Sequence, residues 1–289
     1  MLKPRIIGIL VVRKSIVVQS IAFSRYLPLG KPEIALDYLN QWGIDEITLL
    51  EIDASHEKRK PCFELVKSLS KYCQVPLAVG GGISELSDIE RLINCGADKI
   101  VLNTALSLNP GLLTKGAELF GAQAIVASID AKNIDSGKYE VFLDSGRIPT
   151  GLSPVELAKR AEACGAGEIL LNSIDRDGSK NGYDIELIRQ VDAATSIPVI
   201  VCGGAGHPGH FAEGIKAGAA AVAAANFLHF IEHSVIAYKN FLKLNSCNIR
   251  LDSYATYDGF GYDFDGRVSK IDDKILDKLR FEYIPEEVI

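Results

Sequence analysis

A repeat with constant spacing constrains this chain more than any other feature of its sequence. The segment PLAVGGGISELSDIERLINCGADKIVLNT (76–104) has a counterpart in PVIVCGGAGHPGHFAEGIKAGAAAVAAAN (198–226), and equivalent positions differ by 122 in residue number. Gly81 thus matches Gly203, and further upstream Asp53 matches Asp175. A register that holds over this length indicates two copies of one half-fold.

Each copy reads as a strand, a glycine turn, a helix and a second strand. In the first copy the apolar run 76–79 stops at the three glycines 80–82, and apolar residues then recur at helical spacing. The next strand, 100–102, ends at Asn103 and Thr104. Glycines at the junction of a strand and a helix leave backbone N–H groups that can face an anion.

Strands and helices alternate through residues 1–250, which we predict to form one domain. The predicted strands are 5–12, 46–52, 76–79, 100–102, 124–129, 168–173 and the two of the second glycine unit, with helices at 32–43, 61–73, after Pro110 and after Pro154. We expect an extended loop at 13–31 and a small hairpin around 139–143. Unbroken alternation gives parallel strands with right-handed crossovers.

About eight such pairs with twofold repetition predict an α/β fold closed into a (β/α)8 TIM barrel. The alternative, an open doubly wound sheet, predicts one glycine fingerprint near the N-terminus. This chain has two glycine turns, both late in their halves.

Residues 251–289 lie outside the repeat and are predicted to form a C-terminal extension. Aromatic and acidic residues alternate in its first part, and Ile271, Ile275 and Leu279 share one face of a predicted helix. We expect this extension to pack on the barrel wall, with a partner-docking arm as the alternative. Its aspartates lack the spacing of a calcium loop, so no metal site is assigned.

Composition excludes several classes of function. With 31 basic and 37 acidic residues, the net charge of −6 argues against a nucleic-acid partner. No apolar run reaches the ~20 residues of a membrane span. No cofactor motif is evident. The six cysteines have no metal-ligand spacing and are predicted to be reduced buried thiols, and we expect a cytoplasmic protein.

In a barrel of this kind the active site lies at the carboxyl ends of the strands. Asp130 ends the predicted fifth strand and is the candidate for proton transfer, because an unpaired carboxylate there is costly to bury. The two glycine turns, each with a polar residue at the end of the next strand, predict two phosphate sites on one elongated substrate. Either turn alone could equally be a structural turn without a ligand.

The motifs EITLLEIDAS, VGGGI, GADKIVLNTA, SIDAK, PTG, GAGEILLNSIDRDGSKNGYD and PVIVCGGAG resemble the cyclase subunit of imidazole glycerol phosphate synthase. The resemblance covers nearly all of residues 1–250. It implies a (β/α)8 barrel that pairs with a glutaminase, receives ammonia through the barrel and joins it to a bisphosphorylated ribulosyl ribonucleotide.

The resemblance also assigns roles by motif. Asp130 is similar to the catalytic acid of the family. One phosphate site corresponds to Gly81, Gly82, Asn103 and Thr104, and the other to Asp177, Gly178, Gly203, Gly204, Ala225 and Asn226. The ammonia gate corresponds to Arg5, Glu46, Lys99 and Glu168, which from the residues alone would be a structural salt-bridge network. Positions facing the glutaminase correspond to Asp98 and Gln123.

The departures from the family pattern lie in the predicted active site. Val11 stands where the family has a catalytic aspartate, and the other changes are Gln19 for a lysine, Glu51 for an aspartate, Cys202 for a serine and Asn226 for a serine. Because valine cannot transfer a proton, the usual cyclisation should be crippled: positioned acid–base catalysis contributes ~10²–10⁴-fold in rate.

Three functions therefore remain open. The first is an ammonia-accepting synthase subunit that binds a phosphorylated small molecule and serves a sugar amidination or surface glycan pathway, with a sugar amidotransferase as a further partner. The second is an authentic histidine-pathway cyclase in which Glu51 or Asp53 replaces the missing base. The third is a noncatalytic scaffold that activates a glutaminase and passes ammonia on.

Overall fold

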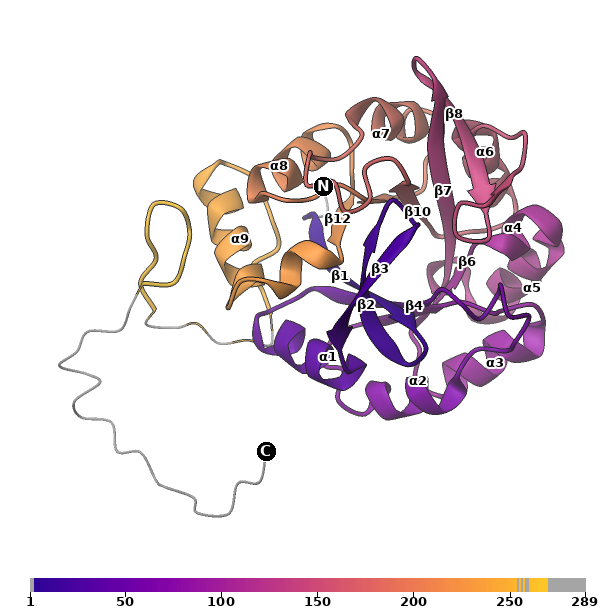
Figure 1. The fold of residues 1–289 in the computed structure, drawn as a ribbon, viewed down its shortest axis with the longest axis horizontal. Coiled ribbons are helices and arrows are strands. Elements are labelled where there is room, and N and C mark those ends of the chain that lie inside the picture. The colour runs from indigo at the N-terminus through magenta and orange to yellow at the C-terminus, as the bar shows by residue number, and fades with distance from the viewer. Residues whose placement is uncertain (1–2, 254, 256, 258–259, 270–289) are drawn as a thin grey trace.

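Eight parallel strands form a closed barrel at the centre of the molecule (Figure 1). The computed structural model describes residues 3–253, 255, 257 and 260–269. The barrel strands are β1 (Arg5–Arg13), β4 (Glu46–Glu51), β5 (Leu77–Gly80), β6 (Lys99–Leu102), β7 (Ile125–Asp135), β10 (Glu168–Ser173), β11 (Val199–Cys202) and β12 (Ala221–Ala224). Pairing of β7 with β10 and of β12 with β1 closes the ring. The predicted (β/α)8 barrel is confirmed, and the open sheet is excluded.

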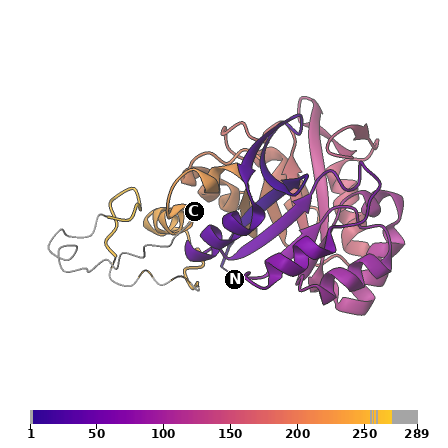
Figure 2. The ribbon, with the colours of Figure 1, turned by 60° about the horizontal axis from the view of Figure 1, so that its bottom comes forward.

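Helices cover the outside of this barrel (Figures 1 and 2). They are α1 (Pro32–Gln41), α2 (Phe63–Ser70), α3 (Leu86–Asn94), α4 (Thr104–Leu108), α5 (Pro110–Phe120), α6 (Pro154–Ala163), α7 (Ile185–Asp192), α8 (Pro208–Lys216) and α9 (Ser234–Leu244), with short 3-10 helices η1 (Ala122–Ala124) and η2 (Asn226–His229). Local sequence sets their starts. Ser153 caps α6 by accepting from the Glu156 N–H, and Pro154 follows at the first helical position.

The twofold repeat is visible in the element boundaries. Strands β4, β5 and β6 recur as β10, β11 and β12, and helices α1, α2 and α3 recur as α6, α7 and α8, with both bounds shifted by 122 residues each time. The two glycine turns therefore follow β5 and β11, which occupy equivalent places in the two halves of the ring. Parallel strands in one barrel direct both turns to the same face.

Two layers of buried side chains hold the barrel together. One lies between strands and helices and includes Leu36, Ile47 and Phe211; the other fills the barrel interior and includes Ile9 and Leu170. Fully burying one such side chain stabilises the fold by roughly 1.5–3 kcal/mol. Because the interior is packed, the barrel is a core and not an open pore.

The prediction of an extended loop at 13–31 is wrong. Residues Ile16–Ile21 form β2 and Arg25–Gly30 form β3, an antiparallel hairpin that continues from β1. Its turn contains Ala22 and Phe23, both with left-handed backbone conformation. A turn without glycine or asparagine carries none of the usual hairpin signals, so the sequence did not reveal it. The hairpin predicted around 139–143 is confirmed by β8 (Lys138–Leu143), which pairs with β7 and β9 (Ile148–Pro149).

Part of the predicted C-terminal extension lies within the described residues. The Tyr257 hydroxyl is 2.9 Å from His233 Nδ1 and donates to the carbonyl of Gln41 at 3.4 Å, so this residue contacts the end of α1 and the start of α9. The helix predicted around Ile271, Ile275 and Leu279 lies outside the described residues. The boundary at residue 250 stays a prediction.

Candidate functional site

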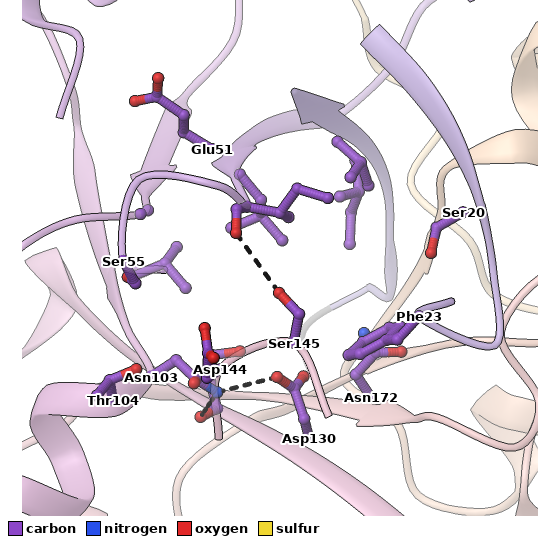
Figure 3. Close-up of a pocket in the computed structure, with 18 of the residues that line it drawn as sticks. Ser20, Phe23, Glu51, Ser55, Asn103, Thr104, Asp130, Asp144, Ser145 and Asn172 are labelled. Carbon is purple, nitrogen blue, oxygen red and sulfur yellow. Dashed lines mark hydrogen bonds between the residues drawn. The ribbon is translucent and has the colours of Figure 1, made fainter. Parts of the chain in front are cut away.

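A cavity of about 130 Å³ opens at the carboxyl ends of the barrel strands (Figure 3). Its wall contains residues from seven barrel strands, near their carboxyl ends or directly after them: Val11, Glu51, Gly80, Gly81, Gly82, Asn103, Thr104, Asp130, Asn172 and Cys202. The predicted proton-transfer residue and the whole first phosphate site therefore share one cavity, at the end of the barrel where chemistry is expected.

Asp130 lies near the centre of this wall, on β7. The side-chain amide of Asn103 donates to one of its carboxylate oxygens at 3.1 Å (Figure 3). Burial raises the pKa of Asp130 to about 7, with a further contribution from the negative charge of Asp177, against the lowering effect of hydrogen bonds from Asn103 and Asn172. A carboxyl group with this pKa can both donate and accept a proton near neutral pH.

The first glycine turn fits closely against its neighbours. Gly81 and Gly82 have φ angles of 112° and 70°, and a Cβ on Gly81 would collide with the carbonyl of Glu51. The Gly82 N–H donates to Ser55 Oγ at 3.2 Å, a weak contact that a stronger acceptor such as phosphate could replace. Asn103 and Thr104 follow β6 beside this turn and line the same cavity.

The second glycine turn borders a smaller cavity of about 30 Å³. Its wall contains all six residues of the second predicted phosphate site: Asp177, Gly178, Gly203, Gly204, Ala225 and Asn226. Three residues, Asp177, Cys202 and Ala225, line both cavities. The two predicted phosphate sites therefore adjoin one another across shared residues on the same face of the barrel.

The β2–β3 hairpin covers this face. Ser20 Oγ donates to Asp177 Oδ2 at 2.6 Å, the Phe23 N–H donates to the same oxygen at 3.2 Å, and the Asn226 amide donates to the Ser20 carbonyl at 2.8 Å. Phe23 and Tyr26 add aromatic rings to the wall of the larger cavity. Burial raises the pKa of Asp177, so these donors face a carboxylate with little access to water.

Sequence reasoning missed several cavity residues. Ser20, Phe23 and Tyr26 come from the hairpin that was predicted to be a loop, and Asp144 and Ser145 come from the turn after β8. Two signals could have indicated a strand there: the run of β-branched residues at 16–18, and the offset of 122 that relates this segment to the predicted hairpin around 139–143.

The departures from the family pattern have clear positions. Val11 and Cys202 line the larger cavity, whereas Gln19 is half-buried on β2 and is absent from both described cavity walls. The Glu51 carboxylate points away from the cavity centre (Figure 3), 2.5 Å from Arg59 NH1, and accepts the Cys62 N–H at 3.0 Å. Burial raises the pKa of the Cys202 thiol to about 12, which leaves it protonated and unreactive.

Asp53, the second candidate for a replacement base, is also engaged. It lies 2.6 Å from Arg59 NH2 and accepts the Lys14 N–H at 2.9 Å. Both Glu51 and Asp53 thus pair with the same guanidinium, which fixes the direction of both carboxylates.

The sequence profile of the histidine biosynthesis protein family matches residues 5–234 of this chain. The chain belongs to the histidine biosynthesis protein family. It is 44% identical over 270 residues, 92% of this chain and 98% of the relative, to a protein of Vibrio vulnificus (strain YJ016) provisionally named imidazole glycerol phosphate synthase subunit hisF2. It is also 44% identical over 252 residues, 87% of this chain and 99% of the relative, to the imidazole glycerol phosphate synthase subunit HisF of Thermotoga sp. (strain RQ2).

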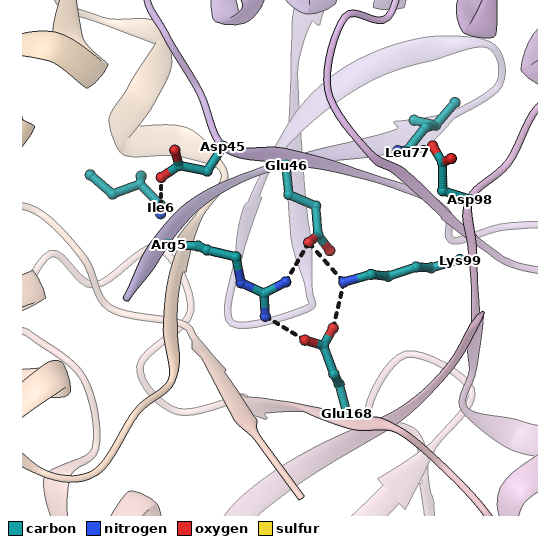
Figure 4. Close-up of polar contacts among 8 residues, drawn as sticks. All are labelled: Arg5, Ile6, Asp45, Glu46, Leu77, Asp98, Lys99 and Glu168. Carbon is teal, nitrogen blue, oxygen red and sulfur yellow. Dashed lines mark hydrogen bonds and ion pairs between the residues drawn. The ribbon is translucent and has the colours of Figure 1, made fainter. Parts of the chain in front are cut away.

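At the opposite end of this histidine biosynthesis family barrel, four charged side chains form a ring (Figure 4). Arg5 lies 2.8 Å from Glu46 and also contacts Glu168, while Lys99 lies 2.8 Å from Glu46 and 2.6 Å from Glu168. Burial raises the pKa of Glu46 against the opposing charges of Lys99 and Arg5. The structure thus brings all four predicted gate residues together at the amino ends of β1, β4, β6 and β10.

The two positions predicted to face a glutaminase lie near the amino ends of β6 and β7, and both are exposed. The Asp98 carboxylate accepts the Leu77 N–H at 2.8 Å, and the Gln123 amide donates to the Phe120 carbonyl at 3.2 Å. These contacts fix the direction of both side chains without burying them.

Three further features concern the described residues as a whole. None of the helices defined above is both long and apolar enough to cross a bilayer. All six cysteines have free, partly buried thiols, less buried than the sequence predicted. The described part of the chain contains no cluster of three or more His, Cys, Asp or Glu side chains arranged to hold a metal ion.

Proposed function

We propose that this chain is a synthase subunit of the imidazole glycerol phosphate synthase type, which takes ammonia from a glutaminase and binds a phosphorylated substrate. The observation that carries the proposal is the separation of two sites at opposite ends of one barrel. The charged ring lies at the amino ends of the strands, and the cavity with Asp130 and both glycine turns lies at the carboxyl ends. The names of both relatives, each a synthase subunit, support the same function.

We further propose that the imidazole-forming step is altered or lost. The reacting face has Asp130 as a proton donor but offers Val11 where the family is expected to place a base, and the two carboxylates that could replace it are held by Arg59. A single acid without its partner base loses much of the ~10²–10⁴-fold that positioned acid–base catalysis supplies.

We propose that the protein serves a sugar amidination or surface glycan pathway, in which a sugar amidotransferase is a further partner. Two observations support a role apart from histidine synthesis. The resemblance implies changes at several cavity positions at once, and the match to hisF2 extends over 270 residues of alignment against 252 for HisF. The longer match agrees with an extension beyond the barrel that the two hisF2-type chains have in common.

A second candidate function, an authentic histidine-pathway cyclase, is favoured by one observation. Asp130 retains a raised pKa of about 7 at the centre of the cavity, as a working acid needs. The identity to HisF, also 44%, is compatible with it.

Assays of the purified chain with ammonium salt and the histidine-pathway substrate separate these functions. We expect cyclisation at or near background, little rescue by Val11→Asp because neighbouring residues have changed too, and stimulated glutamine hydrolysis when the chain is mixed with its cognate glutaminase. Turnover by the unmodified chain within about tenfold of ~10 s⁻¹ would establish the authentic cyclase instead. Absence of both a complex and stimulated hydrolysis would refute the ammonia-accepting role.

A further inference from the structure

Lys180 has no role in the sequence-based assignment, yet it lines the smaller cavity. It lies in the loop that connects β10 to α7, two residues after Gly178. Its ammonium group is 5.8 Å from the ring centre of Phe230, within the range of a cation–π interaction, and it forms no ion pair with any described residue.

The backbone at Lys180 is held in a specific conformation. Its φ angle is 62°, a left-handed value that is uncommon for a residue with a long side chain. The loop after the second glycine turn packs directly against it, because a Cβ on Gly206 would collide with the Cβ, Cα and carbonyl oxygen of Lys180. Lys180 therefore lies at the edge of the cavity, with its backbone fixed by the neighbouring loop and its exposed side chain beside the ring of Phe230.

The charges in the two cavity walls differ. Among the described residues that line the larger cavity, four carry a carboxyl group: Glu51, Asp130, Asp144 and Asp177. The other ionisable residues of this wall are Tyr26 and Cys202, and none is basic. The nearest lysine to the first glycine turn, Lys60, is 2.8 Å from Asp88 and 3.0 Å from Ser84 Oγ, and it is absent from that wall. In the smaller cavity the charged groups are Asp177 and Lys180.

Asp177 would repel an anion at the second turn. Its Oδ2 atom already accepts from Ser20 and Phe23, which reduces but does not cancel the charge. Lys180 is the counter-charge among the described wall residues, so an anion can occupy this cavity because Lys180 is present.

We propose that Lys180 binds the phosphate group at the second glycine turn and makes this turn the stronger of the two phosphate sites. The proposal rests on the proposed function, in that it requires phosphate to bind at these turns. A substrate with two phosphates then binds one of them beside Lys180 at the second turn and the other at the first turn.

The test is a calorimetric titration of the full chain with ribose 5-phosphate, a compound with a single phosphate. Lys180→Met should weaken binding about tenfold, equivalent to about 1.4 kcal/mol, a larger loss than Thr104→Val causes at the first turn. Lys180→Arg should retain most of the affinity, because the guanidinium also binds phosphate. Gly206→Ala, which displaces Lys180 without removing its charge, should weaken binding in the same direction.

Lys216→Met, at the exposed end of α8, is the matched control for loss of one positive charge and should bind as the unmodified chain does. Equal affinities for Lys180→Met and the unmodified chain, or a larger loss in Thr104→Val, would overturn the proposal. No binding by the unmodified chain would instead refute the phosphate sites of the proposed function. Circular dichroism of each variant excludes misfolding as the cause of a lost signal.

Discussion

At the scale of single residues, Asp130 is the group whose chemistry the barrel changes most. Its carboxyl is surrounded by the cavity wall, faces the charge of Asp177 and receives one hydrogen bond from Asn103 that partly offsets both effects. Val11 on β1 lines the same cavity, and its side chain cannot take up a proton. At a pH near 7 this carboxyl is therefore divided between its neutral and its charged form.

This raised pKa predicts a pH-dependent stability. The folded carboxyl titrates near 7, whereas the unfolded one titrates near 3.8, so the penalty for burying its charge is absent below about pH 4 and grows as the pH rises to 7. Asp130→Asn should therefore stabilise the protein above pH 7 by up to about 4 kcal/mol, since one pKa unit corresponds to about 1.36 kcal/mol. The gain should shrink toward zero at pH 4.

Urea unfolding of the two proteins between pH 4 and pH 9 measures this difference. Asp135→Asn, at the exposed end of the same strand, is the control and should show no such pH dependence. A constant difference between Asp130→Asn and the unmodified chain at every pH would contradict a raised pKa.

The sequence predicted those site residues whose position follows from a strand end, and missed those whose position depends on contacts with distant parts of the chain. Asp130 and the glycine turns were predictable because strand ends in a parallel barrel converge on one face, so their sequence position sets their location. The pairing of Glu51 with Arg59 was not, since the two lie eight residues apart across an irregular turn and no periodicity links them. Ser20 and Phe23 depend on a contact with Asp177, more than 150 residues away in the chain.

At the scale of elements, the β2–β3 hairpin is held by the site that it covers. Ala22 and Phe23 adopt left-handed conformations that cost free energy in residues with side chains. The offsetting contacts come from another loop: the Ala22 N–H donates to the Asp177 carbonyl at 3.0 Å, and Phe23 and Ser20 donate to its carboxylate. The turn therefore depends on tertiary contacts, which explains why the local sequence did not reveal it.

We predict that Ser20→Ala loosens this hairpin without unfolding the barrel. Loss of a hydrogen bond to a buried carboxylate should cost about 1.5 kcal/mol, which corresponds to a more than tenfold rise in local opening. Hydrogen–deuterium exchange of the Ala22 and Phe23 amides should accelerate accordingly, while exchange in the barrel strands stays unchanged.

Ser15→Ala, in the exposed turn between β1 and β2, is the control and should leave these rates unaltered. Unchanged exchange at Ala22 and Phe23 in Ser20→Ala would show that Asp177 does not hold the hairpin.

At the scale of the whole molecule, the constant offset of 122 residues determined the topology. Each half supplies the same series of strands and helices, and the two halves close on each other through the β12–β1 and β7–β10 pairs. Such a pattern was sufficient to predict a closed barrel and the common direction of both glycine turns. The same offset relates β2 (Ile16–Ile21) to β8 (Lys138–Leu143), so the hairpins after β1 and β7 also belong to the repeat, although only the second was predicted.

The charged ring links four different strands of the barrel, at the end opposite the cavity. Glu46 is 1% exposed in its side chain and depends on Arg5 and Lys99 for its counter-charge. Lys99→Met should therefore destabilise the protein, though by less than the roughly 3–5 kcal/mol of losing a sole partner, because Arg5 remains.

The loss in Lys99→Met should also depend on pH in a defined direction. Without Lys99 the pKa of Glu46, already raised by burial, rises further, so the folded state binds its proton more tightly than the unfolded state does. The penalty is then greatest above the folded pKa and declines as the pH falls toward the unfolded value. The unfolding temperature of Lys99→Met should lie far below that of the unmodified chain at pH 8 and only slightly below it at pH 4.5. Lys67→Met on α2 is the control.

Ribose 5-phosphate binding at the other end of the barrel should survive in Lys99→Met, since the ion pairs of the ring involve none of the described cavity residues. In the complex with a glutaminase, glutamine hydrolysis by Lys99→Met should continue while ammonia escapes to solution. The reason is that the ring at the barrel entrance has lost one of its four charged side chains. Equal stability of variant and control at pH 8, with no change in ammonia release, would mean that the ring neither supports the barrel nor controls what enters it.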